Sequence, residues 1–510
     1  MKSNLKKLIC CVCICFLLTC VIDLNAQYVF YEYGDTTYID VGNDKQLFID
    51  DFLIDLNKHI DFVMNPPYQT GEIIIDTDLP HEKDGLILPY SSVIKDKDGK
   101  IRIWYDLTIP ALENVKKRTA GYAESNNGID FKKPVLGKYE VKGSKKNNIV
   151  FPPEANGGTA VWIDPMALAE HRYKTQSKVY PSKELHIYSS PDGIDWSFYA
   201  NVDPRDGPVD TQTIIFWDKN LGKYLLFTRE RIYGRCVRRA EMNDLESSLE
   251  NTGFAIWTDI KDQYTYFSER ADRSKPEDLR NDAPMGYYGA TIFPYENVYI
   301  GLAQAFWHWK GRGEHDLRPG MRDVRLLISR DSKEFKRMGN RKAFMGPGPS
   351  GRFDSKCVWA LPNPIVMGDE IWIYYVGWNF DRIGRIDPDA PDGMSRSVLS
   401  RAIMRLDGFV SADAPYEGGE MITKPITFKG NKLEINANTG AGGSIRVEIL
   451  DHDGYPIPGF SIEESNWIVG NSVRFPVSWT SDGNLESLNG KIVRLRFVMR
   501  DCKLYAFQFK

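Results

Sequence analysis

Three aspartates occupy comparable places in this 510-residue chain. Asp84, Asp210 and Asp354 each stand just before a stretch that we expect to be a β-strand. Cleavage of a glycosidic bond usually needs two carboxyl groups, one protonated acid and one ionised base or nucleophile. These aspartates are therefore candidates for the acid, base and pKa-modulating roles. An aspartate before a strand also caps turns, so a structural role is the alternative for each.

A fourth candidate acid is Glu230, which follows the apolar strand predicted at residues 223–228. Its neighbour Arg229 could pair with a carboxylate or with a substrate oxygen. A surface ion pair is the alternative for both residues. Four further side chains suit the binding of a sugar by ring stacking and hydrogen bonding, although a packed aromatic cluster would use the same residue types: Tyr288, Trp307, His308 and Trp378.

Short antiparallel strands repeat along the chain, and this repetition predicts how the candidates are positioned. Each repeat has an apolar-aromatic strand, a tight turn and a partner strand, and several end in a Ser-x-Asp turn. Such regular repetition is typical of a β-propeller. We expect five blades, at residues 84–135, 150–202, 210–260, 285–340 and 354–412. The innermost strands of a propeller begin near its axis, so Asp84, Asp210 and Asp354 should face one funnel. The second blade lacks a clear carboxylate at its start.

The fold class predicted is all-β, a five-bladed propeller followed by a C-terminal β-sandwich. We assign residues 27–414 to the propeller, with a strand segment at 27–80 that packs against it or closes it. After residue 415 the strands alternate apolar and polar residues and are separated by glycine-rich turns, which favours a small sandwich over 415–510.

The first 26 residues read as an export signal. Basic residues precede an apolar run of about 13 residues, which is too short to span a bilayer. Cleavage after Ala26 would release a soluble protein, whereas the Leu17–Cys20 stretch resembles a lipobox and would anchor a lipid at Cys20. We expect an exported protein, periplasmic, secreted or on the cell surface, with no membrane span.

Charge, motifs and cysteine content disfavour several classes of ligand and chemistry. The net charge of −4 disfavours nucleic acid. No phosphate-binding loop, serine-hydrolase elbow or zinc-protease motif is present. Outside the signal only Cys236, Cys357 and Cys502 remain, far apart and without histidines at metal spacing, so we expect buried thiols and no zinc site. No cofactor is expected, with a structural calcium ion left open, and oligomeric state is not predicted.

Four phrases carry a resemblance: QLFIDDFLI at 46–54, YSSPDGIDW at 188–196, TKPITF at 423–428 and LYAFQ at 504–508. With the five repeats, they resemble exported bacterial glycosyl-hydrolase-like proteins of the five-bladed propeller superfamily, which includes invertases, arabinanases and mannoside phosphorylases. The invertase-type catalytic signatures are absent, and Ile163-Asp164-Pro165 is only faintly similar to one of them. The resemblance therefore implies the fold and a broad activity.

We therefore expect an exported glycoside hydrolase that acts on a polysaccharide or oligosaccharide in the funnel. Two alternatives stay open. The protein could bind carbohydrate without cleaving it, or it could be a glycoside phosphorylase. A phosphorylase needs a cationic phosphate site, which five arginines could supply: Arg229, Arg231, Arg235, Arg238 and Arg239.

Overall fold

A computed structural model describes most of the chain: residues 30–33, 36–109, 118–152, 160–178, 185–202, 212–230, 236–246, 285–308, 320–481 and 483–510. Within these residues the fold is all-β, which confirms the predicted class at that level. The only helical turns described there are short 3-10 helices at Ala169–His171, Gly339–Arg341 and Leu485–Leu488. None of the described helices is long and apolar enough to cross a bilayer.

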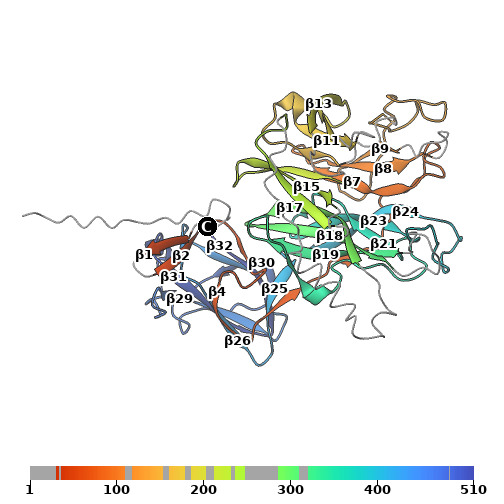
Figure 1. The fold of residues 1–510 in the computed structure, drawn as a ribbon. Helices are drawn as coiled ribbons and strands as arrows, with labels where there is room; N and C mark the ends of the chain where they lie inside the picture. The colour runs from red at the N-terminus through yellow and green to blue at the C-terminus, as the bar shows by residue number, and fades with distance from the viewer. Residues whose placement is uncertain are drawn as a thin grey trace, which may run out of the picture.

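Five antiparallel units, here called repeats 1 to 5, follow one another along the chain (Figure 1). Repeat 1 contains β7 (Ile87–Lys95), β8 (Ile101–Thr108) and β9 (Arg118–Ser125). Repeat 2 contains β10 (Trp162–Ile163), β11 (Tyr173–Lys178), β12 (Leu185–Ser190) and β13 (Ser197–Val202). Repeat 3 contains β14 (Ile214–Asp218), β15 (Lys223–Glu230) and β16 (Cys236–Met242).

Repeats 4 and 5 share one sheet. Repeat 4 contains β17 (Met285–Tyr295), β18 (Val298–His308), β19 (Gly320–Ser329) and β20 (Lys336–Arg337). Repeat 5 contains β21 (Cys357–Ala360), β22 (Ile365–Met367), β23 (Glu370–Trp378) and β24 (Ser397–Arg405). The two are joined by a parallel pairing of Arg322 with Cys357. The first described strands of repeats 1, 3, 4 and 5 begin within four residues of the predicted blade starts, whereas that of repeat 2 begins at Trp162, 12 residues after the predicted start at 150.

The second strand of a repeat is buried on both faces because neighbouring repeats cover it. In β8, Ile103, Trp104 and Tyr105 are all fully buried, although successive side chains of a strand point to opposite faces. The same holds for Ile373 and Tyr374 in β23. Continuous apolar-aromatic runs in these strands therefore reflect sheets packed face against face.

Turns after the third strand join each repeat to the one before it. The indole of Trp104 in repeat 1 donates to the carbonyl of Gly193 in repeat 2, at 2.7 Å. The hydroxyl of Tyr374 in repeat 5 donates to the carbonyl of Gly128 in repeat 1, also at 2.7 Å. Both glycines have positive φ, and a Cβ on either would collide with the aromatic ring below it. The fifth repeat thus contacts the first, and the repeats form a closed ring.

Tyrosine–aspartate hydrogen bonds form a second set of links between consecutive repeats. Each aspartate ends or follows an inner strand, and each tyrosine lies in the second strand of the next repeat. The pairs are Asp96 with Tyr173, Asp164 with Tyr224 at 2.9 Å, and Asp218 with Tyr299. Burial, followed by the neighbouring carboxylate, raises the pKa of Tyr224, so this phenol stays a donor over a wide pH range.

One strand of the N-terminal segment pairs with the ring. This strand, β6 (Tyr68–Gln69), pairs with β24 and forms the outer edge of repeat 5. Beyond it, Ile75 bridges to Leu399, and Arg401 forms an ion pair with Glu72 at 2.7 Å. The last strand of the ring is therefore supplied from the opposite end of the sequence.

Two further sheets form a separate layered region (Figure 1). One sheet contains β1 (Phe30–Tyr33), β2 (Thr36–Gly42), β4 (Ile54–Lys58), β26 (Gly419–Thr423), β27 (Ile426–Phe428), β29 (Ser444–Asp451) and β31 (Val493–Arg500). The other contains β3 (Gln46–Leu47), β5 (Asp61–Met64), β25 (Val410–Ala414), β28 (Leu433–Asn438), β30 (Asn471–Val477) and β32 (Cys502–Phe509). We call this the two-sheet region.

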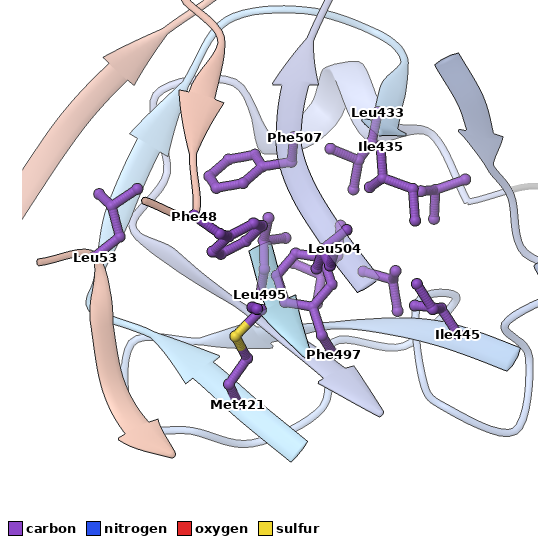
Figure 2. Close-up of a cluster of buried hydrophobic side chains, with 14 of the residues drawn as sticks. Phe48, Leu53, Met421, Leu433, Ile435, Ile445, Leu495, Phe497, Leu504 and Phe507 are labelled. Carbon is purple, nitrogen blue, oxygen red and sulfur yellow. The ribbon is translucent and has the colours of Figure 1, made fainter. Parts of the chain in front are cut away.

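The core of the two-sheet region joins both sheets (Figure 2). Phe48 lies with its ring centre 5.4 Å from that of Phe497 in one sheet and 5.6 Å from that of Phe507 in the other. Phe48 is fully buried, and it comes from the N-terminal segment. The strands β2, β3, β4 and β5 therefore belong by pairing to the two-sheet region, whereas the sequence grouped all of 27–80 with the repeats. Apolar alternation shows that a strand has a buried face but does not identify its partner.

Candidate functional site

The inner strands of different repeats contact one another through hydrogen bonds. The backbone N–H of Val161, just before β10, donates to Ser92 Oγ of β7 at 3.0 Å. The side-chain amide of Gln212, just before β14, donates to the carbonyl of Ser91 at 3.0 Å. Thr291 of β17 donates its hydroxyl to the carbonyl of Ala360 of β21 at 3.1 Å. These hydrogen bonds join the inner strands of repeats 1, 2 and 3, and those of repeats 4 and 5.

A group of aromatic rings and guanidinium groups gathers beside these inner strands. We call it the central cluster, and its members come from repeats 1, 3, 4 and 5: Tyr90, Arg118, Arg229, Tyr288, Arg322 and Trp359. The ring of Trp359 lies 5.5 Å from that of Tyr90 and 5.3 Å from that of Tyr288, edge to face in both cases. Tyr90 and Tyr288 remain partly exposed, so the cluster reaches solvent through them.

Cations lie over the rings of the cluster. Arg118 lies 4.7 Å from the ring centre of Tyr90. Arg229 and Arg322 lie 4.7 Å and 4.8 Å from the ring centre of Tyr288. A π face attracts one cation, but two guanidinium groups on the same ring also repel each other. The cluster is therefore a place where an anionic or strongly polar ligand would be stabilised.

The two guanidinium groups also act on the phenol of Tyr288. Burial raises the pKa of Tyr288, but the positive charges of Arg322 and then Arg229 outweigh burial, and the net pKa lies below the ordinary value of tyrosine. Hydrogen bonding with Arg229 and Tyr90 acts in the same direction. Ten other described tyrosines of the ring have a raised pKa, so Tyr288 is in a distinctly cationic environment: Tyr105, Tyr122, Tyr173, Tyr188, Tyr199, Tyr224, Tyr295, Tyr299, Tyr374 and Tyr375.

Asp106 is a carboxylate that binds a member of this cluster, Arg118, and the sequence analysis did not select it. It lies in β8, two residues before the end of the strand, is fully buried, and accepts two hydrogen bonds from Arg118, one of them from Nε at 3.0 Å. Burial raises the pKa of Asp106, and Arg118 opposes that rise. Like Arg229 in β15 and Trp378 in β23, Asp106 lies in the last three residues of its strand, so a comparison of the ends of these strands would have drawn attention to it.

Asp354 is a predicted catalytic residue that the structure places in a closed polar network. Its carboxylate is fully buried and accepts from Arg352 Nε and Nη2, both at 3.1 Å, and from the hydroxyl of Tyr375 at 2.8 Å. A Cβ on Gly348 or Gly377 would collide with the Asp354 side chain, so close backbone packing surrounds it. This carboxylate is fixed and paired.

The other predicted acids are not brought together with Asp354 by the described residues. Asp84 lies exposed in the turn before β7, with φ of +65°. Asp210 lies outside the described residues, two positions before Gln212. Glu230 ends β15 next to Arg229, and its side chain is likewise outside the description. Their catalytic roles stay predictions.

Two of the four predicted sugar-binding residues reach the central cluster. Tyr288 is a member, and Trp378 lies 5.0 Å from the guanidinium of Arg322. Trp378 also donates to the carbonyl of Ile87 at 3.0 Å, so it ties repeat 5 to repeat 1. Trp307 instead donates to Asp323 at 3.0 Å, and the side chain of His308 is outside the described residues.

Two of the predicted thiols are free and buried, Cys357 and Cys502. Burial raises the pKa of Cys502 to about 12, so this thiol is a poor nucleophile at neutral pH. Across the described ranges, no three His, Cys, Asp or Glu side chains gather in a way that could hold a metal ion.

No protein-family model and no curated protein matches this sequence. The chain is similar to solved glycoside hydrolase and phosphorylase structures. A β-1,2-mannobiose phosphorylase from Listeria innocua is 12% identical, over 67% of this chain and 97% of that one, with a TM-score of 0.43. A glycosyl hydrolase from Bacteroides ovatus is 12% identical, over 71% and 97%, with a TM-score of 0.38. A thermostable family-43 glycoside hydrolase is 14% identical, over 68% and 96%, with a TM-score of 0.39.

Proposed function

We propose that this protein is an exported glycoside hydrolase, that its five-repeat ring is a five-bladed β-propeller, and that its two-sheet region is a β-sandwich. The observation that carries the proposal is the convergence of Tyr90, Tyr288 and Trp359 with three arginines where the inner strands begin. Aromatic rings beside hydrogen-bonding cations bind the apolar faces and the hydroxyl groups of sugars.

The acid and base are proposed among residues that adjoin this cluster. Glu230 follows Arg229 directly, and Asp210 lies two residues from Gln212, whose amide contacts Ser91 of β7. Asp354 is fixed by Arg352 and fits a modulating role, and Asp84 remains the outlying candidate.

Two other activities each have an observation in their favour. A phosphorylase would use the pair of guanidinium groups at Tyr288 to hold phosphate. Of the arginines predicted for that role, Arg229 reaches the cluster, whereas Arg239 is bound to Glu241 and Ser332. A protein that only binds sugar needs no free carboxylate for acid or base catalysis. The pairing of Asp106 with Arg118 and of Asp354 with Arg352 favours this alternative.

Reducing-end release from a panel of plant and microbial polysaccharides, with and without phosphate, separates these activities. Hydrolysis predicts release that does not need phosphate. Release that depends on phosphate would assign a phosphorylase, and binding without release would assign a sugar-binding protein. Asp84→Asn serves as an internal comparison, because full activity of this variant would remove Asp84 from the catalytic set.

A further inference from the structure

The most unusual charged group of the described chain is the guanidinium of Arg322. The residue is 4% exposed. Its described polar contacts are weak: Nη1 lies 3.7 Å from the Sγ of Cys357, and the buried Nε has no hydrogen-bond partner. No carboxylate forms an ion pair with Arg322 in the part of the chain that the structure describes.

Aromatic rings occupy the space that a counter-charge would normally take. The guanidinium lies 4.8 to 5.9 Å from four ring centres: Tyr288, Phe306, Trp359 and Trp378. Ring faces compensate part of the cost of burying a cation, but burying an ion without a paired charge still costs several kcal/mol. Neighbouring arginines differ in this respect, since Arg118 is paired with Asp106 and Arg325 with Asp323 at 2.6 Å.

Arg229 adds to the positive charge. It is 3% exposed and lies over the same Tyr288 ring as Arg322. Two buried guanidinium groups around one partly exposed phenol form a site whose charge is complementary to a small anion. A planar carboxylate matches the forked donors of arginine better than a hydroxyl does.

We propose that the central cluster binds the carboxylate of an acidic sugar, with Arg322 as the principal partner and Arg229 as the second. This inference rests on the proposed function and narrows it: the substrate is a glycan that contains uronic acid residues. The ring of Tyr288 holds the two guanidinium groups apart, and Trp359 supplies a stacking face beside them.

Binding is tested by calorimetry on the mature full-length protein, with an oligo-uronate and its carboxyl-reduced neutral form as matched probes. The wild type should bind the uronate at least about 10-fold more tightly, equal to about 1.4 kcal/mol, and the preference should weaken as salt rises. Arg322→Met should abolish the preference, and Arg322→Lys should retain part of it. Arg446→Gln is the matched control, because it removes one half-buried guanidinium, which lies over the ring of Trp467, from the two-sheet region.

A second readout separates binding from structure. If Arg322 is kept for a ligand, then replacing the buried cation with the similarly shaped Met should leave the melting temperature unchanged or raise it. A lower melting temperature with the uronate preference intact would show a structural role and overturn the proposal. Equal binding of acidic and neutral probes would also overturn it.

Inorganic phosphate is the other source of an oxyanion. Phosphate that binds at the cluster and is lost in Arg322→Met, without any uronate preference, would assign the anion to a phosphorolytic co-substrate and overturn the acidic sugar. The binding measurement does not depend on catalysis. Preferential binding of the uronate without bond cleavage would support the acidic-sugar site and refute hydrolysis. Cleavage of neutral glycans alone would support hydrolysis and refute the acidic-sugar site.

Discussion

The sequence predicted some side chains at the central cluster and missed others. Arg229, Tyr288 and Trp378 flank recognisable strands, and all three contact the cluster or Arg322. Arg118, Arg322 and Trp359 were missed because they lie in β9, β19 and β21, where the local sequence does not show which residues meet the other repeats. Register shifts in β7, between Leu88 and Ser92, and in β17, between Tyr287 and Gly289, lie beside the cluster residues Tyr90 and Tyr288.

The lowered pKa of Tyr288 leads to a spectroscopic prediction. In the folded protein its phenol should ionise below the usual tyrosine value of about 10. A depressed pKa adds stability as pH rises through the folded value, opposite to the buried tyrosines of the ring. Absorbance titration at 295 nm should therefore show that Tyr288→Phe has lost an early-ionising tyrosine, with folding checked by circular dichroism. Superimposable curves for the two proteins would contradict the cationic environment.

Asp354 should be needed for stability as well as for any chemistry. Asp354→Asn removes charge from a fully buried carboxylate that binds Arg352 and Tyr375. We expect a loss of about 1–3 kcal/mol in the free energy of unfolding, measured with urea. Glu417→Gln, an exposed carboxylate, is the control and should change little. If Asp354→Asn matched that control, the buried network would not contribute to stability.

At the scale of strands, the repeats were predictable because alternation, tight turns and Ser-x-Asp signals are local. The Ser190–Asp192 turn is held by its own hydrogen bonds: Ser190 donates to Asp192 at 2.9 Å, and Asp192 accepts from two following N–H groups. Ser329 and Asp331 repeat the arrangement in repeat 4. The links between repeats were not predictable, since they join residues about 60 to 250 positions apart.

The tyrosine–aspartate links predict an alkaline weakness of the ring. Because the pKa of Tyr224 is raised by burial and by Asp164, its stabilising contribution is complete below about pH 10 and is lost above it. Tyr224→Phe should cost about 1–3 kcal/mol at pH 7, since buried Asp164 loses a donor. Melting temperatures from pH 7 to 11 measure both effects. Tyr455→Phe, an exposed residue, should behave like the wild type; a Tyr224→Phe protein that does so would refute the link.

At the scale of the molecule, both ends of the chain build both parts. The N-terminal strands complete the two-sheet region, and β6 completes the ring. Residues 415–510 expressed alone lack β2 to β5 and β25, so much of the apolar core around Phe48 would be exposed. We expect that fragment to be unfolded by circular dichroism and to require residues 36–64 for folding. A cooperatively folded 415–510 fragment would contradict this interdependence.

Export makes a separate prediction for the whole protein. Mass spectrometry of material isolated from the native cell envelope should give a mature chain that begins at Gln27, or at Cys20 with lipid attached. Cys20→Ser would distinguish them, because only the lipoprotein route depends on that thiol. An intact residue 1–26 segment in the mature protein would refute the export signal.

The most direct test of the central claim is reducing-end release by the wild type, Asp210→Asn and Glu230→Gln on one polysaccharide panel, with folding confirmed for each. The account predicts release by the wild type and a loss of at least about 100-fold in one or both variants, as expected when an acid or base is removed. Undiminished release in both variants would contradict the assignment of the catalytic site to the centre of the ring.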